Sequence, residues 1–148
     1  MSTRLTIRLD FDAGRRLGAG KIALLETIEK TGSISAAGRA QGMSYRRAWL
    51  LVDDLNQLFA EPLVAAHHGG VNGGGASLTA EGRRIVALYR DAEAKMRSAA
   101  ETEIDAIEGG LATPGRAAAA QAAIAPGGIG SGHSSIQLTA SSRRDRTA

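Results

Sequence analysis

The sequence predicts a mainly α-helical fold that contains one small β-hairpin and ends in a long helix. Apolar residues recur at the 3.6-residue spacing of a helix in residues 21–30, 33–59 and 79–108. A Gly-Met-Ser turn interrupts the second of these stretches at residues 42–44. Two short β-prone runs enclose the glycine-rich residues 69–75, which is typical of a hairpin. Together these features predict a winged helix-turn-helix followed by a long C-terminal helix.

Length and composition indicate one soluble domain with an appendage. The chain has 148 residues and a formal net charge of +3. Residues 1–108 hold fourteen Lys and Arg and fourteen Asp and Glu residues, so the excess charge lies beyond them. The lack of cysteine excludes disulfides and Cys-based zinc sites. Because no apolar run approaches about 20 residues and no signal-peptide core is present, we expect a cytoplasmic protein without a membrane partner.

The N-terminal part predicts a strand, a loop and a helix. Residues 4–9 alternate, with Leu5, Ile7 and Leu9 on one face, as in a half-buried strand. Residues 10–20 contain three glycines among charged residues and predict a loop. Residues 21–30 predict a helix that ends before Gly32.

The helix after the Gly-Met-Ser turn is predicted to have one buried and one outward face. Ser44 is placed as its N-cap, with the hydroxyl accepting a backbone N–H one turn on. At about 100° per residue the inward and outward sets separate cleanly. The inward residues are Ala48, Leu51, Val52, Leu55 and Phe59, and the outward residues are Arg46, Leu50, Asp53 and Gln57.

Charge placement in this region favours binding to a polyanion. Arg46 and Arg47 lie in the first helical turn, where the helix dipole disfavours cations unless an anion is shared. Between Lys30 and Val52 every charged residue is basic, whereas a solvated face usually mixes signs. A DNA phosphate is the expected anion. The alternative is an ordinary amphipathic helix pair that never contacts DNA.

The roles expected of individual residues follow from their positions. We expect Arg46 to read guanine, Arg47 to hold phosphate and Leu50 to contact a thymine methyl. Tyr45 and Trp49 lie between core and groove, where packing and DNA contact are both open. Ser33 and Ser35 open the preceding helix, where they either bind phosphate or cap the helix. The predicted DNA-binding set is Ser33, Ser35, Ser44, Tyr45, Arg46, Arg47, Trp49 and Leu50.

The hairpin is predicted from residues 63–68 and 76–78, with its glycine tip as the wing. No phosphate-loop spacing follows the glycines, so a nucleotide cradle is not expected. Adjacent histidines on a strand point to opposite faces, and we therefore expect no metal site there. No grouping of catalytic residues is recognised, so we expect no enzyme. The predicted wing set is His67, His68, Gly69, Gly70, Asn72, Gly73 and Gly74.

Residues 79–108 predict one helix of nearly thirty residues, about 45 Å long, capped by Thr79. So small a bundle cannot cover that length, and we expect the far half to pair with a second copy. The predicted dimerisation residues are Leu88, Ala92, Met96, Ala99, Ile104 and Ile107. Residues 109–148 are rich in Ala, Gly and Ser and predict a disordered tail, which leaves residues 1–108 as the folded domain.

Four motifs resemble the N-terminal domain of ModE-type, molybdate-dependent regulators, which is related to the winged-helix head of LysR-type regulators. They are Gly32-Ser-Ile-Ser-Ala-Ala, Gly42-Met-Ser-Tyr-Arg-Arg-Ala-Trp, the glycine wing from Gly69, and Gly82-Arg-Arg. The resemblance covers residues 4–108 and implies a homodimer that binds a palindromic operator in double-stranded DNA. Gly38 and Gln41 stand where the family usually has Ala and Leu, which predicts a less stable domain.

The resemblance stops before the molybdate-binding domains of the family. The tail shows no strand alternation, so we expect no molybdate-binding barrel in it. The sequence thus predicts a DNA-binding transcriptional regulator with no cofactor within this chain, although a molybdate response stays possible. One alternative is a regulator with an oxyanion site at the dimer interface. The other is a winged-helix protein-interaction module, whose binding would be less sensitive to salt.

Overall fold

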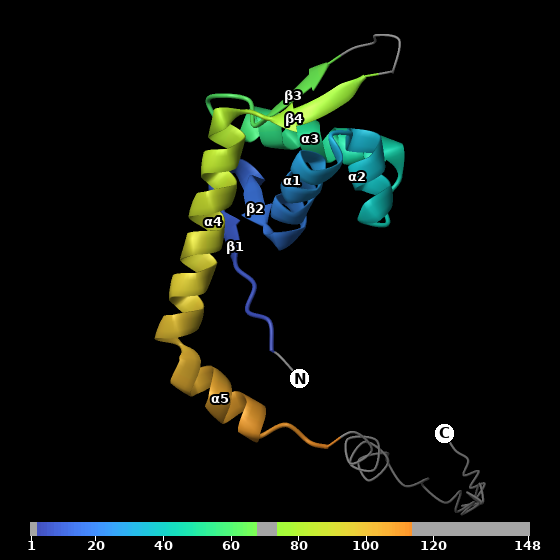
Figure 1. The fold of residues 1–148 in the computed structure, drawn as a ribbon. Helices are drawn as coiled ribbons and strands as arrows, with labels where there is room; N and C mark the ends of the chain where they lie inside the picture. Colours follow the sequence, from blue (N-terminus) through green and yellow to red (C-terminus); the bar gives the residue numbers. More distant parts are fainter. Residues whose placement is uncertain (1–2, 68–73, 114–148) are drawn as a thin grey trace, which may run out of the picture. The chain divides into compact units, whose positions relative to one another are not determined.

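The computed structural model describes residues 3–67 and 74–113. Its helices are α1 (Ala19–Thr31), α2 (Ile34–Ala40), α3 (Tyr45–Leu58), α4 (Ala80–Ala99) and α5 (Glu101–Gly109) (Figure 1). Strands β1 (Arg8–Asp10) and β2 (Arg16–Gly18) flank the short 3-10 helix η1 (Asp12–Gly14), and β3 (Val64–His67) pairs with β4 (Gly75–Leu78). The predicted mainly helical fold with a β-hairpin is confirmed.

Helix α1 is the centre of the core, with α2 on one side and α4 on the other (Figure 1). Ile22, Leu25 and Ile28 are fully buried, as their helical spacing predicts. Leu24 is fully buried as well, although it lies off that stripe. A helix surrounded by neighbours buries more than one stripe, which is why periodicity alone did not include this residue.

Helices α2 and α3 form the predicted helix-turn-helix, and Gly38 lets them pack closely. A Cβ atom added at Gly38 would lie 2.9 Å from the Cβ of Ala48 in α3. Helix propensity alone did not predict this close approach, which the missing methyl permits; the lower stability expected of the domain stays a prediction. Gln41 is not misplaced, since its Nε2 donates to Thr27 Oγ1 of α1 at 2.8 Å.

The β3–β4 hairpin is fastened to the helices by polar contacts. Asn56 of α3 accepts hydrogen bonds from the N–H groups of Leu63 and Val64 at 2.9 and 3.0 Å, and donates to the Val64 carbonyl at 3.1 Å. On the other strand, the Ala76 N–H donates to the Gly32 carbonyl at 2.8 Å. These bonds orient the hairpin against the C-terminal ends of α1 and α3.

Helix α4 begins against the chain that leaves α3. The Thr79 hydroxyl accepts from the Gly82 N–H at 3.0 Å, which confirms the predicted cap, and donates to the Pro62 carbonyl at 2.7 Å. A Cβ at Gly82 would overlap the Leu63 carbonyl oxygen, so the helix start lies directly on that backbone. Further along α4, the Tyr89 hydroxyl donates to the Ile7 carbonyl at 2.6 Å and holds the N-terminal segment.

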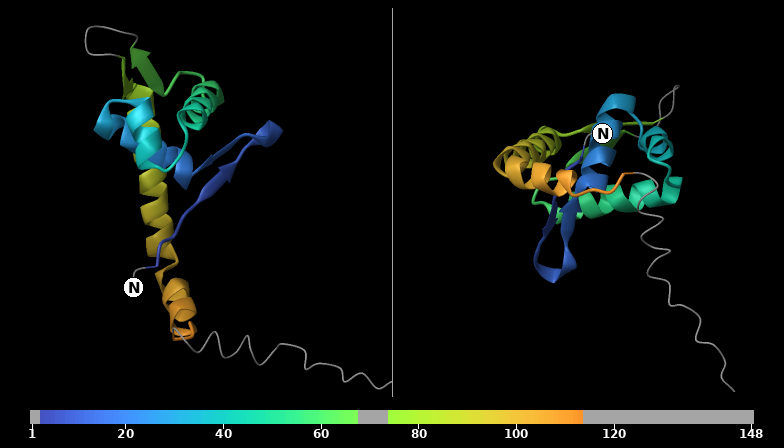
Figure 2. Two further views of the ribbon diagram at one scale, coloured as in Figure 1. Left: turned by 90° about the vertical axis from the view of Figure 1, so that its right-hand side faces the viewer. Right: turned by 90° about the horizontal axis from the view of Figure 1, so that it is seen from below.

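The N-terminal expectation needs correction. The strand covers only residues 8–10, and residues 16–18 pair with it antiparallel instead of belonging to a loop (Figure 2). Leu5 and Ile7 are half-buried, but Leu9 is exposed although its cross-strand partner Leu17 is buried. The range predicted as a loop also includes the first two residues of α1, which begins at Ala19.

The long final helix is interrupted, contrary to the prediction of one continuous element. Ala100 has φ −104° and ψ 14°, which ends α4, and α5 starts at the next residue (Figure 1). Glu101 and Glu103 lie in the first turn of α5, where the helix dipole favours acidic side chains. These acidic residues support a new helix start at a position with no covering core.

Candidate nucleic-acid interface

The first half of α3 presents its outward face to solvent. The Ser44 hydroxyl accepts from the Arg47 N–H at 3.2 Å, so the predicted N-cap is confirmed. Arg46 and Arg47 are exposed, and the neighbouring apolar residues Tyr45 and Leu50 are 61% and 55% exposed. On the opposite face Ala48, Val52 and Leu55 are buried, whereas Leu51 and Phe59 pack only partly against the core.

The basic residues of the helix-turn-helix have no acidic partners within the described residues. Arg39, Arg46 and Arg47 form no salt bridge there. The arginines of α4 are bonded differently, because Arg90 bridges Glu26 and Glu93 at 2.7 and 2.8 Å. Arg39, Arg46 and Arg47 are therefore available to an anion from outside, whereas Arg90 of α4 is already paired with two carboxylates.

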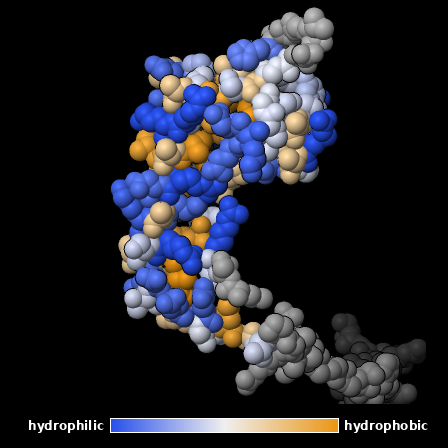
Figure 3. All heavy atoms as spheres, viewed as in Figure 1, coloured by the Kyte–Doolittle hydropathy of each residue, from blue (hydrophilic) through white to orange (hydrophobic). Residues whose placement is uncertain are grey.

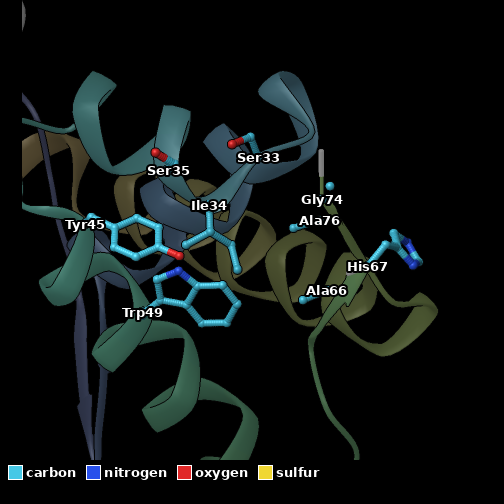
Figure 4. Close-up of a pocket in the computed structure, with 10 residues that line it drawn as sticks. Ser33, Ile34, Ser35, Tyr45, Trp49, Ala66, His67, Gly74 and Ala76 are labelled. Atoms are coloured by element: carbon cyan, nitrogen blue, oxygen red, sulfur yellow. The ribbon is translucent and has the colours of Figure 1, made fainter. Parts of the chain in front are cut away.

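A cavity of about 260 Å³ lies between the start of α2, the start of α3 and the β3–β4 hairpin (Figure 4). Ser33 uses its hydroxyl to cap α2, accepting from the Ala36 N–H at 3.2 Å. Ser35 lies within α2 and is 3.5 Å from Arg39 Nη1. Capping thus explains Ser33, and phosphate contact by either serine stays a prediction. The cavity is lined by Ser33, Ile34, Ser35, Tyr45, Trp49, Ala66, His67, Gly74, Gly75 and Ala76.

Tyr45 and Trp49 form an edge-to-face pair at the mouth of this cavity, with ring centroids 6.1 Å apart and an interplanar angle of 73° (Figure 4). Trp49 packs against the core cluster, so packing accounts for its ring. Its Nε1 is buried and finds no hydrogen-bond partner among the described residues. That N–H is a spare donor beside the reading face, which sequence analysis did not single out.

The described part of the wing consists of the two strands and Gly74. His67, at the end of β3, and Gly74, just before β4, are both exposed and line the cavity. The predicted residues His68, Gly69, Gly70, Asn72 and Gly73 lie outside the described residues. Within the described ranges, no group of three His, Cys, Asp or Glu residues is placed to hold a metal ion.

The predicted dimerisation residues form an apolar stripe along α4 and α5. Leu88, Met96 and Ile107 are 51%, 48% and 68% exposed, and Ala99 is exposed too. Ala92 and Ile104 are half-buried. Figure 3 shows hydrophobic surface interrupted by hydrophilic residues along these two helices. Leu111, which follows α5 in the sequence, is also exposed.

Comparisons with known proteins find relatives of this chain among molybdenum-related proteins and regulators. The chain is 47% identical over 100 residues to the molybdenum transport protein ModE of Azotobacter vinelandii. It is 51% identical over 81 residues to the molybdenum-pterin-binding protein MopB of Rhodobacter capsulatus. It is also 44% identical over 69 residues to the DNA-binding transcriptional dual regulator ModE of Escherichia coli. This chain carries a winged-helix domain of the ModE type.

The matches cover 66%, 55% and 47% of this chain but only 37%, 30% and 26% of the three relatives. The chain therefore spans about a third of the length of these curated proteins. No protein-family model matches the sequence. A LysR family transcriptional regulator of known structure overlaps 55% of this chain and 26% of its own, with 16% identity and a TM-score of 0.43.

The structure adds to the ModE-type domain several residues that sequence analysis passed over. Asn56, with its three hydrogen bonds to the strand after α3, gave no periodic or motif signal. Glu29 accepts from the Leu78 N–H and from Arg83 Nε, and both bonds lower the pKa of its carboxyl.

No helix in the described ranges is long and apolar enough to span a membrane.

Proposed function

We propose that this chain is a non-enzymatic transcriptional regulator that binds a palindromic operator in double-stranded DNA as a homodimer. The observation that carries the proposal is the exposed, capped start of α3, where Arg46 and Arg47 lack acidic partners in the described structure. The names of the relatives support the same function, since two of those compared are ModE proteins and one is called a DNA-binding regulator. As such, it would act in the cytoplasm.

In the proposed complex α3 enters the major groove and the wing lies along the backbone. Arg46 reads guanine through two parallel N–H···acceptor bonds, which discriminates bases by about 1–3 kcal/mol. Arg47 meets phosphate from the flank of the helix, and exposed Leu50 meets a thymine methyl. Exposed His67 of the wing offers a further contact to the DNA backbone.

The test is the double variant Arg46→Ala, Arg47→Ala, with affinity measured for the chain's own upstream DNA and for random DNA at fixed salt. We expect operator affinity to fall at least tenfold while far-UV circular dichroism and the sedimentation coefficient stay unchanged. Arg84→Ala is the matched control, because Arg84 is exposed but paired with Glu81 on α4. Unchanged operator affinity in the double variant would show that α3 is not the reading helix.

The homodimer in this proposal uses the apolar stripe of α4 and α5. An aspartate at Leu88 or Met96 would place a charge in the expected interface, so we expect sedimentation equilibrium to report a monomer for Leu88→Asp, Met96→Asp. Ala87→Asp is the control, since Ala87 is exposed on the same helix but about 100° from Leu88. A dimer that survives the double substitution would place the interface elsewhere.

A molybdate response is a separate arm of the same binding experiment. Specific DNA binding that is indifferent to molybdate would mean that the signal is protein level or another partner. If molybdate tightened binding, the first place to substitute is the groove of about 540 Å³ beside α4, which includes Arg4, Arg90 and Arg97 in its lining. Binding to a protein partner, insensitive to salt and to DNA, would instead favour an interaction module.

A further inference from the structure

The β1–β2 hairpin and α3 enclose a basic groove on the flank of α3 away from the wing. Its volume is about 550 Å³. Three of its lining side chains are cationic, Arg15, Arg16 and Lys21, and one is acidic, Asp54. The remaining lining residues are Gly14, Leu51, Gln57 and Leu58. The groove therefore carries an excess of positive charge, whereas residues 1–108 as a whole hold equal numbers of basic and acidic residues.

These cations are oriented by backbone groups and not neutralised by carboxylates. Arg15 Nε donates to the Asp12 carbonyl at 3.1 Å, and Lys21 Nζ donates to the Arg16 carbonyl at 3.0 Å. Within the described ranges none of the three forms a salt bridge. By contrast Arg8 of the same hairpin is paired with Asp10 at 3.0 Å. A bond to a neutral carbonyl fixes a cation in place while leaving its charge unmatched.

The groove lies along the second half of α3, and the reading residues Arg46 and Leu50 lie in the first half of the same helix. Gln57 lines the groove and also belongs to the outward stripe of Arg46, Leu50 and Asp53. Trp49 lies on the other side of that stripe, next to the β3–β4 hairpin. The left view of Figure 2 shows the β1–β2 hairpin projecting from the bundle on the side where α3 lies. The two hairpins thus lie on opposite sides of the outward stripe of α3, the β3–β4 hairpin beside its first half and the β1–β2 hairpin beside its second half.

The hairpin holds its charges at a defined position. The Phe11 N–H donates to the Arg15 carbonyl at 2.7 Å and closes the turn, with Ala13 and Gly14 at φ 59° and 72°. At its base Leu17 is buried in the core cluster, and Leu9 pairs with it across the ladder. A turn tied in this way places Arg15 and Arg16 without the ordering entropy of a mobile loop.

We propose that the β1–β2 hairpin is a second phosphate-binding element, which contacts the DNA backbone through Arg15, Arg16 and Lys21 beside the major groove entered by α3. The inference rests on the proposed function and adds a contact surface to it. DNA presents one charge per about 1.7 Å of duplex, so an unmatched cation next to the reading face meets phosphate regardless of sequence. The hairpin therefore contributes affinity and not base discrimination.

The experiment compares Arg15→Ala, Arg16→Ala with wild type for operator and random duplexes over a range of salt concentrations. We expect both affinities to fall by the same factor, about fivefold or more at low salt, with the operator-to-random ratio unchanged. The slope of log affinity against log salt should shrink by about 1.8, since each phosphate contact contributes about 0.9. Arg8→Ala, the paired cation of the same hairpin, should match wild type, and Arg15→Lys, Arg16→Lys should restore most of the affinity.

The failures of the two proposals are distinguishable. If Arg46→Ala, Arg47→Ala weakens operator binding while Arg15→Ala, Arg16→Ala changes neither affinity nor salt slope, the hairpin surface is wrong and the reading helix stands. A changed operator-to-random ratio in the hairpin variant would overturn the assignment to phosphate. Wild-type protein without affinity for any duplex would overturn both proposals.

Discussion

Replacing Gly82 with alanine tests how α4 is seated on the rest of the domain. Gly82 is the third helical residue of α4, and its own conformation is compatible with alanine. The added Cβ would overlap the Leu63 carbonyl oxygen and lie 3.1 Å from the carbonyl carbon and 3.3 Å from the Cα of Leu63. Since all three atoms are backbone, no side-chain rotation relieves the overlap.

The size of the effect follows from what must move. The gain in helix propensity from Gly to Ala is at most about 1 kcal/mol. Against it stands displacement of the helix start, which strains packing by about 1–3 kcal/mol. Displacement also disturbs the Thr79 bonds to Leu63 and Pro62, at 2.9 and 2.7 Å, each contributing about 1 kcal/mol. We expect a net loss of about 2–4 kcal/mol in the free energy of unfolding.

The assay is urea unfolding at one fixed protein concentration, followed by far-UV circular dichroism and by the fluorescence of Trp49. Fixed concentration matters because dimerisation would make the midpoint depend on it. Gly20→Ala is the control, since Gly20 also lies in the first turn of a helix but has no neighbouring atom within 4 Å of a new Cβ. Equal urea midpoints for Gly82→Ala and Gly20→Ala would refute the close packing of the start of α4 against the Leu63 backbone.

Three further changes probe the same reasoning. Gly38→Ala should lower the free energy of unfolding despite the better helix propensity of alanine, because the new Cβ would lie 2.9 Å from the Cβ of Ala48. The midpoint of urea unfolding measures this loss. Asn56→Ala should cost about 2–3 kcal/mol by leaving backbone groups unpaired, with Asn56→Asp intermediate since it keeps an acceptor. Below about pH 4.5 stability should fall as Glu26 is protonated, and Glu26→Gln should flatten that fall.

The sign of the pH effect follows from the Arg90 contacts. The hydrogen bond from Arg90 lowers the pKa of the Glu26 carboxyl in the folded state. A carboxyl with a depressed folded pKa contributes stability above its unfolded pKa and loses it as pH falls through the folded value. Glu103→Gln is the control because Glu103 is exposed and has no salt bridge in the described structure. An equal acid response in both variants would contradict this account.

The sequence by itself determined the local features. Ser44 and Thr79 cap their helices as predicted, because a cap needs only a hydroxyl next to N–H groups two or three residues on. The buried stripe of Ala48, Val52 and Leu55 follows from helical spacing, which the chain fixes before it packs. The same spacing placed Arg46 and Leu50 on the exposed face.

Tertiary structure alone decided the features that join distant residues. Whether Gly38 weakens a helix or permits a contact depends on where Ala48 lies ten residues later. The pairing of residues 8–10 with 16–18, and the groove that this hairpin forms with α3, depend on a turn held in the left-handed region at Ala13 and Gly14. The break at Ala100 arises where the core no longer supports the helix. Propensity and periodicity describe neighbours along the chain, whereas these outcomes are set by the energies of contacts across it.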